Sequence, residues 1–176
     1  SNKKVVSTFH CIDRKHEKWG WFARKILTLG EWAACKFPHK TIVVSKGLKK
    51  YTKENYNYNS TYIPKGVPLY EKNTNTDKIK QWGLQKNNYI FLISRFIPHK
   101  GIHYAIKAYK QLKQEKSFDK KLAITGGGYH TDEYTNKIEE MAASEPDVIL
   151  TGFQSNETLK QLFSNAYMML SPSDAE

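Results

Sequence analysis

The chain of 176 residues contains only two cysteines, Cys11 and Cys35, and neither has a CxxC or zinc-ligand spacing. Two cysteines are too few for a disulfide scaffold, so the sequence favours a reduced, cytoplasmic protein. No apolar run approaches the roughly 20 residues of a membrane-spanning helix, and residues 1–30 lack the apolar stretch of a signal peptide. The glycines form neither a Walker A loop nor a GxGxxG fingerprint, which excludes both of these nucleotide sites.

Apolar residues make up 39% of the chain and aromatic residues 13%, which is enough for a packed core and excludes a disordered chain. Lys and Arg number 28 against 17 Asp and Glu, which gives a net charge of +11. Residues 1–60 hold 13 basic and 4 acidic residues (+9), whereas residues 61–176 hold 15 and 13 (+2). The basic character therefore belongs to the first third of the chain.

Short apolar runs of strand length alternate with segments of helical periodicity. We expect strands at residues 5–9, 41–45, 62–63, 89–93, 121–125, 148–151 and 167–170, and helices at 17–36, 46–53, 102–112, 132–143 and 156–164. Ser155 is expected to cap the last helix. The polar stretch 51–60 predicts a linker. The alternation is typical of an α/β protein with a Rossmann-like parallel sheet covered by helices on both faces.

Ligands of such sheets bind at the carboxyl ends of the strands. Arg95 and Lys100 stand between a buried strand and a helix start, where a guanidinium fork and an ammonium group suit a diphosphate. A solvated basic loop is the alternative. The triple glycine 126–128 permits close backbone approach to a ligand, or is simply a flexible turn.

The histidines and acidic residues do not indicate a metal site. His10, His16 and their neighbours have no ligand spacing that matches a closed zinc site. His99 and His103 are four residues apart, but Pro98 and Gly101 disfavour the continuous helix that would place both on one face. Glu176 follows the last expected strand, where a carboxylate could bind sugar hydroxyls or stabilise positive charge. It could equally be an ordinary acid at a helix N-terminus.

The expected helix 17–36 has a largely apolar face with Lys and Arg around it, formed by Trp21, Phe22, Lys25, Ile26, Leu29, Trp32 and Ala33. Three interpretations are open: a core helix with a solvated face, a helix on an anionic membrane surface, or a nucleic-acid-binding helix. The last is the weakest, because no nucleic-acid recognition motif accompanies it.

The order of the segments ISRFIPHKGIHYAI, LAITGGG, VILTGF and YMMLSPSDAE resembles the donor-binding domain of GT-B-fold retaining glycosyltransferases of family 4. The earlier segments STFHCID, TIVVS and YIPKGV resemble the end of the N-terminal domain of that family. The resemblance implies that residues 1–57 are an incomplete acceptor domain and residues 58–176 a truncated donor-binding domain. Lys65 departs from the family's usual Asn, and the second glutamate of the E-x7-E motif would lie beyond residue 176.

The resemblance also implies roles for single residues. Arg95 and Lys100 would hold the donor diphosphate and stabilise the leaving group. Glu176 and His10 would contact the donor sugar, so that the implied catalytic set is Arg95, Lys100, Glu176 and His10. The implied donor-binding set is Arg95, Lys100, Gly127, Phe153, Gln154, Ser173, Asp174 and Glu176, with Phe153 and Gln154 beside the base and Ser173 and Asp174 near the sugar and phosphates.

The expected function is therefore transfer of a hexose-type sugar, with retention, from a UDP- or GDP-linked donor to a glycan or lipid-linked acceptor. The resemblance implies no metal or other cofactor, no nucleic acid, and a role in bacterial polysaccharide, lipopolysaccharide or other glycoconjugate synthesis. The expected location is the cytoplasm, with peripheral contact to the anionic inner face of the plasma membrane as an open alternative. We expect the chain to be part of a longer protein and inactive alone. A non-catalytic nucleotide-binding Rossmann-like module and a basic nucleic-acid-binding domain are the alternative functions.

Overall fold

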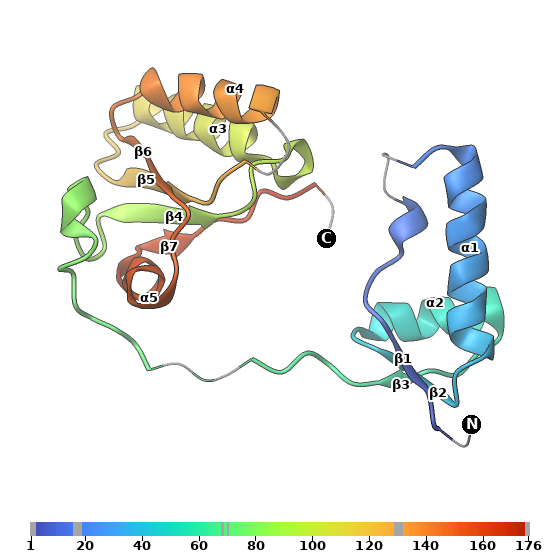
Figure 1. Cartoon of the computed structure of the whole chain (residues 1–176). Helices are drawn as coiled ribbons and strands as arrows, with labels where there is room; N and C mark the ends of the chain where they lie inside the picture. The colour runs from blue at the N-terminus through green and yellow to red at the C-terminus, as the bar shows by residue number, and fades with distance from the viewer. Residues whose placement is uncertain (1–2, 16–18, 68, 70, 129–131, 175–176) are drawn as a thin grey trace. The chain divides into compact units, whose positions relative to one another are not determined.

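The computed structural model describes residues 3–15, 19–67, 69, 71–128 and 132–174. The chain forms two compact units, Ser1–Leu69 (unit 1) and Tyr70–Glu176 (unit 2). Each unit has its own parallel sheet with helices packed against it, as Figure 1 shows. The expected α/β class, with a second Rossmann-like part, is confirmed.

Unit 1 contains a three-stranded parallel sheet in the order β1-β2-β3. Its strands are β1 (Val6–Phe9), β2 (Lys40–Val43) and β3 (Thr61–Tyr62), and its helices are α1 (Trp21–Lys36), α2 (Lys46–Tyr56) and the short 3-10 helix η1 (Asp13–Lys15). Phe9, Val43 and Leu48 form the small buried core between the sheet and α2.

The expected linker at 51–60 is wrong in its first half, because α2 continues to Tyr56. Thr52 lies on the buried side of this extension, where its hydroxyl is 2.8 Å from that of Ser60. β3 then pairs with β2 in parallel, Ile42 opposite Thr61. This pairing places residues 61–62 in the sheet of unit 1, which extends to Leu69, whereas the expected division lies after residue 57.

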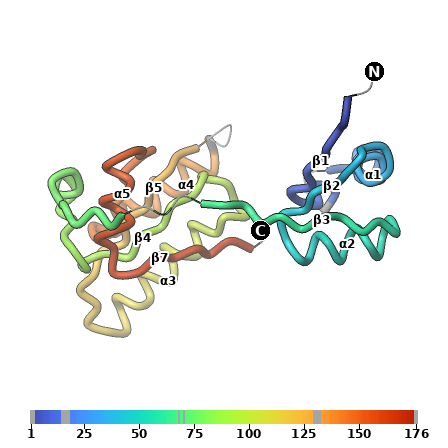
Figure 2. Tube along the Cα trace, turned by 90° about the horizontal axis from the view of Figure 1, so that it is seen from below, coloured from blue at the N-terminus to red at the C-terminus, as the bar shows by residue number. Residues whose placement is uncertain are grey.

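Unit 2 contains a four-stranded parallel sheet in the order β6-β5-β4-β7. The strands are β4 (Tyr89–Ile93), β5 (Lys121–Thr125), β6 (Val148–Gly152) and β7 (Met168–Met169). The helices are α3 (Ile102–Glu115), α4 (Asp132–Ala143) and α5 (Asn156–Asn165), with the 3-10 helices η2 (Lys80–Trp82) and η3 (Pro98–Lys100). Figure 2 shows β7 alongside β4, the strand that it pairs with through Ile90 and Met168.

The helices of unit 2 cover both faces of its sheet. From β4 the chain moves outward through α3 to β5 and through α4 to β6, and then returns through α5 to β7 on the other side of β4. Because parallel crossovers are right-handed, the reversal of direction places α5 on the face opposite to α3 and α4, as Figure 1 shows.

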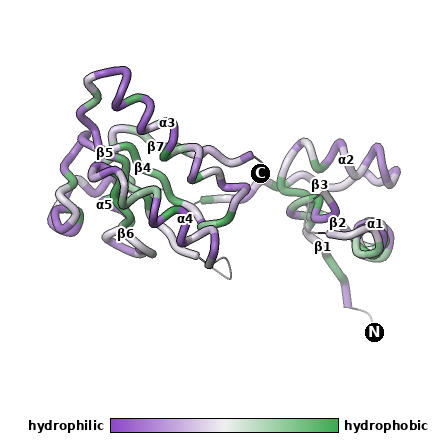
Figure 3. Tube along the Cα trace, turned by 90° about the horizontal axis from the view of Figure 1, so that it is seen from above, coloured by the Kyte–Doolittle hydropathy of each residue, from purple (hydrophilic) through white to green (hydrophobic). Residues whose placement is uncertain are grey.

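Alternate residues of β4 supply the two cores of unit 2. Ile90 and Leu92 pack in the cluster that includes Ile106 of α3 and Ile138 of α4. Tyr89 and Phe91 belong to the second cluster, with Leu162 of α5. The strand is buried on both faces, which explains its continuous apolar sequence, drawn in green in Figure 3.

The prediction that the side chain of Ser155 caps the last helix is wrong. Ser155 occupies the N-cap position of α5, but its side chain accepts no hydrogen bond from the helix. The following residue, Asn156, has a φ of 49°, so the chain enters α5 through a left-handed residue. By contrast, the hydroxyl of Ser45 caps α2, accepting from the amide of Leu48 at 3.1 Å.

Replacing Phe91 with Ala tests this two-sided core. Phe91 is 0% exposed whereas Phe153 is 82% exposed. The same Phe→Ala substitution at the two positions therefore isolates the contribution of burial to stability. We expect Phe91→Ala to lower the free energy of unfolding by about 3–5 kcal/mol and Phe153→Ala to change it by less than about 0.5 kcal/mol. Urea-induced unfolding followed by circular dichroism measures both. Equal losses would contradict the assigned core.

Candidate nucleotide-binding site

The candidate site lies where the strand order of unit 2 reverses. β4 is followed along the chain by β5 on one side, and β7 pairs with its other side. The chain leaves β4 through α3 toward β5 and reaches β7 through α5 on the other side, so the strand order reverses between β4 and β7. At such a reversal a crevice opens at the carboxyl ends of the strands. In an open parallel sheet this switch point is the usual place for a ligand.

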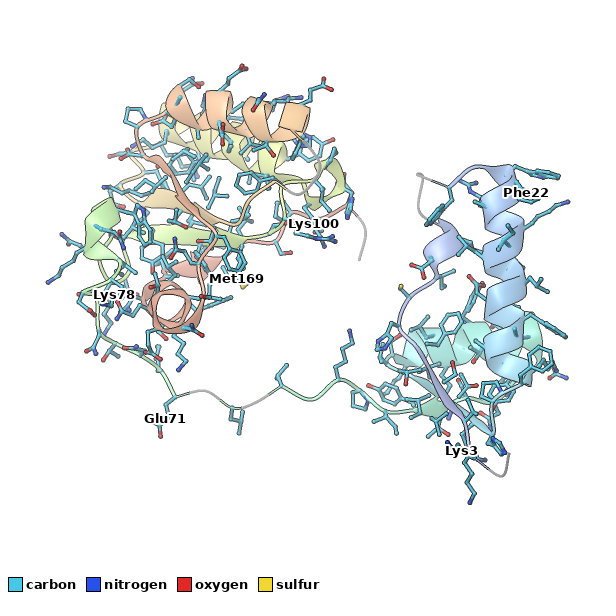
Figure 4. All side chains as sticks on the ribbon, viewed as in Figure 1. Lys3, Phe22, Glu71, Lys78, Lys100 and Met169 are labelled. Atoms are coloured by element: carbon cyan, nitrogen blue, oxygen red, sulfur yellow. The ribbon has the colours of Figure 1, made fainter. Side chains whose placement is uncertain are left out.

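A cavity of about 230 Å³ occupies this switch point. Arg95 and Lys100, from the loop after β4, line it on one side, and Ser171, Pro172 and Ser173, from the segment after β7, line it on the other. The structure thus brings together three of the residues expected from the sequence, Arg95, Lys100 and Ser173. Figure 4 labels Lys100 at this edge of unit 2.

Both cations are free to meet an anion. Arg95 is exposed and Lys100 is half-buried. In the part of the chain that the structure describes, neither side chain forms an ion pair or a hydrogen bond. The two positive charges at the cavity are therefore not neutralised by a described carboxylate, and a guanidinium and an ammonium group on one cavity suit a phosphate or diphosphate.

A glycine allows the two walls of the cavity to approach. Gly101 ends η3 with a φ of 67°, and a Cβ at this position would overlap the carbonyl oxygen of Pro172. The amide of Asp174 also donates to the carbonyl of His99 at 3.0 Å. The segment after β7 is therefore fixed against the loop that carries Lys100, with Asp174 exposed beside the cavity.

The triple glycine fixes the loop after β5 in the same way. Gly126 has a φ of 139°, and a Cβ there would overlap the carbonyl oxygen of Ser94. Gly127 accepts a hydrogen bond from the amide of Phe96 at 2.9 Å. The structure shows that Gly126 closely approaches the loop after β4, while the approach of a ligand to the triple glycine stays a prediction.

Phe153 and Gln154 lie at the other edge of the sheet, after β6. They do not line the cavity of Arg95 and Lys100. Phe153 is exposed, and the side-chain amide of Gln154 donates to the carbonyl of Thr151 at 2.6 Å. Their expected contact with a base stays a prediction.

Two further expected site residues cannot be assigned to this cavity. Glu176 is outside the residues that the structure describes. His10 belongs to unit 1, where it lines a separate cavity of about 410 Å³ with Cys11 and Glu31. Their roles toward a donor sugar stay predictions.

Ser171 and Pro172 line the cavity without being among the expected binding residues. Their only sequence signal is their position directly after an expected strand, which residues 171 to 176 all share. The close approach of Pro172 to Gly101 depends on tertiary packing, which the local sequence does not reveal.

The apolar face of α1 is exposed, which contradicts its interpretation as a core-facing surface within this chain. Trp21 is 71% and Phe22 69% exposed, and Ile26, Leu29 and Trp32 are also exposed. The buried side of the helix instead carries Glu31 and Cys35. Figure 4 shows Phe22 on the outer side of α1.

Among the residues that the structure describes, no three His, Cys, Asp or Glu side chains lie close enough together to hold a metal ion. None of the described helices has the length and apolar character that crossing a bilayer requires.

Unit 2 is thus a Rossmann-like open parallel sheet with a cavity at the reversal of its strand order. The sequence profile of the family described as "Glycosyl transferases group 1" matches residues 74–176, more than half of the chain. The chain therefore belongs to this glycosyltransferase family. No curated protein matches the chain at a significant level.

Several solved structures have a similar fold. Anabaena Alr3699/HepE in complex with UDP and glucose has a TM-score of 0.76 at 18% identity, covering 98% of this chain and 47% of its own. Sucrose-phosphate synthase from Thermosynechococcus elongatus has a TM-score of 0.74 at 23% identity, covering 97% and 45%. S. aureus TarM with fondaparinux, alpha-GlcNAc-glycerol and UDP has a TM-score of 0.70 at 18% identity, covering 97% and 32%. The chain spans less than half the length of these structures.

Gly126 and Gly127 form a matched pair that tests how the site is held. Gly126→Ala places a Cβ in a positive-φ residue against the Ser94 carbonyl, whereas a Cβ at Gly127 would meet nothing within 4 Å. We expect Gly126→Ala to lower the free energy of unfolding of unit 2 by about 1–3 kcal/mol from backbone strain, and Gly127→Ala to change it by less than about 1 kcal/mol. Urea unfolding measures the difference. Equal behaviour of the two variants would refute the close approach.

Proposed function

We propose that unit 2 binds the nucleotide-diphosphate sugar donor of a retaining, family 4 glycosyltransferase, with Arg95 and Lys100 holding the diphosphate. The observation that carries the proposal is that both cations line one cavity at the strand-order switch point and that neither forms an ion pair with a carboxylate of the described residues. The family to which the chain belongs supports sugar transfer. The similar HepE structures contain UDP with glucose or UDP-glucose, which favours a UDP-linked sugar here.

In the proposed reaction, negative charge develops on the diphosphate as the bond to the sugar breaks. Fixed cations at this place stabilise the transition state more than the ground state, which is how they would accelerate the step. Arg95 would contribute a planar fork to one phosphate and Lys100 a point charge to the other. Ser173 would add a hydroxyl donor from the opposite wall of the cavity.

The remaining parts of this proposal follow the resemblance to the family. We infer that a hexose-type sugar is transferred with retention, without a metal or other cofactor, to a glycan or lipid-linked acceptor. The process would be cytoplasmic synthesis of a bacterial polysaccharide, lipopolysaccharide or related glycoconjugate. His10 and Glu176 would contact the donor sugar.

Nucleotide titration tests the site. We expect calorimetry to detect UDP binding by the chain and an affinity lower by about 10- to 100-fold in Arg95→Ala and in Lys100→Ala, because each loses a charge-assisted hydrogen bond worth roughly 1.5–3 kcal/mol. GDP and ADP, titrated in parallel, identify the preferred base.

Lys86→Ala is the matched control, because Lys86 is an exposed cation of unit 2 that does not line the cavity. It removes the same net charge as Lys100→Ala and should leave UDP affinity unchanged. If all three variants bind UDP like the parent chain, the assignment of the diphosphate site fails.

We also propose that unit 1 rests on an anionic membrane surface through α1. The exposed Trp21 and Phe22 stand among basic side chains, and the ammonium group of Lys25 lies 4.0 Å from the centroid of the Trp21 ring. Amphipathic helices of this kind insert their aromatic side chains at the headgroup level while basic residues meet anionic lipids. A lipid-linked acceptor would be presented at such a surface.

Vesicle co-sedimentation tests the membrane contact. We expect binding to vesicles that contain phosphatidylglycerol, weak binding to pure phosphatidylcholine, and release at high salt, because the Debye length falls from about 10 Å at 0.1 M to about 3 Å at 1 M. Phe22→Ala should reduce binding, whereas Tyr104→Ala, which removes an exposed aromatic ring from unit 2, should not. Binding that is indifferent to lipid charge and salt speaks against the proposal.

A further inference from the structure

Helix α2 carries a row of lysines on its exposed side. They recur at the spacing i, i+3, i+4 and i+7, which places them on one face of a helix. This row, the lysine stripe, consists of Lys46, Lys49, Lys50 and Lys53. All four residues are exposed, whereas the residues that α2 buries are Leu48 and Thr52.

The charges of the lysine stripe are largely unpaired. Glu54 is the one acidic residue of α2, and its carboxylate lies 3.8 Å from the ammonium group of Lys50. Both of these side chains are more than half exposed, and an ion pair in solvent contributes little to stability. Within the part of the chain that the structure describes, the other three ammonium groups form no ion pair and no hydrogen bond. The stripe therefore presents a net positive charge to the solvent.

The stability of α2 does not account for this arrangement. The spacing creates four like-charge pairs at i,i+3 or i,i+4, and such pairs destabilise a helix. Lys46 is the first residue of α2, at the positive end of the helix dipole, where a cation is unfavourable. The first turn contains no acidic residue to offset it. A bound anion relieves both effects, so the stripe is typical of a surface that meets anionic groups.

The exposed side of α2 has no apolar or aromatic side chain, and hydrophilic residues predominate along the helix in Figure 3. Its exposed residues are Lys46, Gly47, Lys49, Lys50, Lys53, Glu54 and Asn55. It therefore lacks the aromatic rings on which single-stranded nucleic acids stack their bases. It also lacks the apolar side chains that anchor a helix in a bilayer interface, which α1 does expose at Trp21 and Phe22.

The chemistry of lysine narrows the partner further. An ammonium group on a flexible stem is a point charge, without the planar fork by which arginine recognises a phosphate or carboxylate in a fixed geometry. From Lys46 to Lys53 the stripe extends about 10 Å along the helix axis, since each residue advances a helix by about 1.5 Å. A row of flexible point charges of this length suits a chain of repeated negative charges better than a single anion.

From these observations we propose that the lysine stripe of α2 binds a linear anionic glycan. The ammonium groups contact carboxylate or phosphate groups along the glycan chain and read no sugar ring. The stripe by itself requires only a polyanion. The choice of a glycan rests on the proposed function, because a sugar-transferring protein acts where glycan chains are present.

Fluorescence anisotropy with labelled hexagalacturonate, a glycan with a carboxylate on every sugar, tests the proposal. In the parent chain we expect saturable binding at roughly 50 mM NaCl and about tenfold weaker binding at roughly 200 mM, because binding to several cations releases counterions from the polyanion. Labelled maltohexaose, a neutral glycan of the same number of sugars, should not bind.

Lys49→Ala/Lys53→Ala removes two charges of the stripe and should weaken hexagalacturonate binding about fivefold, as expected for two exposed ionic contacts. Lys3→Ala/Lys4→Ala is the matched control, because it removes the same net charge from exposed positions of unit 1 outside α2. It should bind like the parent chain. Lys49→Arg/Lys53→Arg keeps both charges and should retain binding. Circular dichroism confirms that each variant folds.

Absence of hexagalacturonate binding, or equal binding by the parent chain and by Lys49→Ala/Lys53→Ala, overturns the proposal. Tighter binding of hexathymidylate that depends on the same two lysines would assign the stripe to nucleic acid and overturn it as well. The same holds if Lys49→Ala/Lys53→Ala loses binding to phosphatidylglycerol vesicles while its glycan binding is unchanged, because the stripe would then belong to a membrane contact.

Titrating UDP into the same samples separates this inference from the proposed function. The stripe belongs to unit 1 and Arg95 and Lys100 to unit 2, so Lys49→Ala/Lys53→Ala should bind UDP like the parent chain. Normal UDP binding without hexagalacturonate binding would overturn the stripe assignment alone. Hexagalacturonate binding without UDP binding would overturn the donor site and leave the stripe assigned to an anionic glycan.

Discussion

Close backbone contact at two positive-φ glycines is the constraint on which the candidate site depends. At Gly101 and Gly126 a carbonyl oxygen from another loop occupies the place of a side chain. These contacts bring the loops after β4, β5 and β7 to one edge of the sheet. Arg95 and Lys100 are neighbours in sequence, but only the approach of Pro172 to Gly101 places a second wall, with Ser173, opposite them.

The sheet of unit 2 could be predicted from the sequence because its signals are local. The runs at Tyr89–Ile93 and Lys121–Thr125 match β4 and β5 residue for residue, since strands buried on both faces are apolar throughout. The predicted linker failed at α2, because Tyr51 and Tyr56 belong to a helix whose polar sequence is stabilised by contacts with Glu31. Such long-range partners leave no local pattern.

The functional residues, like the fold, could be predicted from the sequence only in part. Arg95 and Lys100 could be found from the sequence, because strand ends mark the ligand edge of a parallel sheet and cations select anions. The importance of Glu31 could not, since its helix suggested that the apolar residues face inward. The structure places Trp21 and Phe22 outside and buries the acid instead. A buried acid needs partners, and these come from two segments distant in sequence: Arg14 from η1, and Tyr51 and Tyr56 from α2.

The two cavities treat charge in opposite ways. In unit 2 neither Arg95 nor Lys100 forms an ion pair with a described carboxylate, so the stabilisation that they would give a diphosphate would increase as it gains negative charge on leaving. In unit 1 the carboxylate of Glu31 is instead balanced by Arg14 within a buried hydrogen-bond network that includes Tyr51 and Tyr56. A charge that is paired inside the unit stabilises the fold, whereas unpaired cations at a cavity remain available to an anionic ligand.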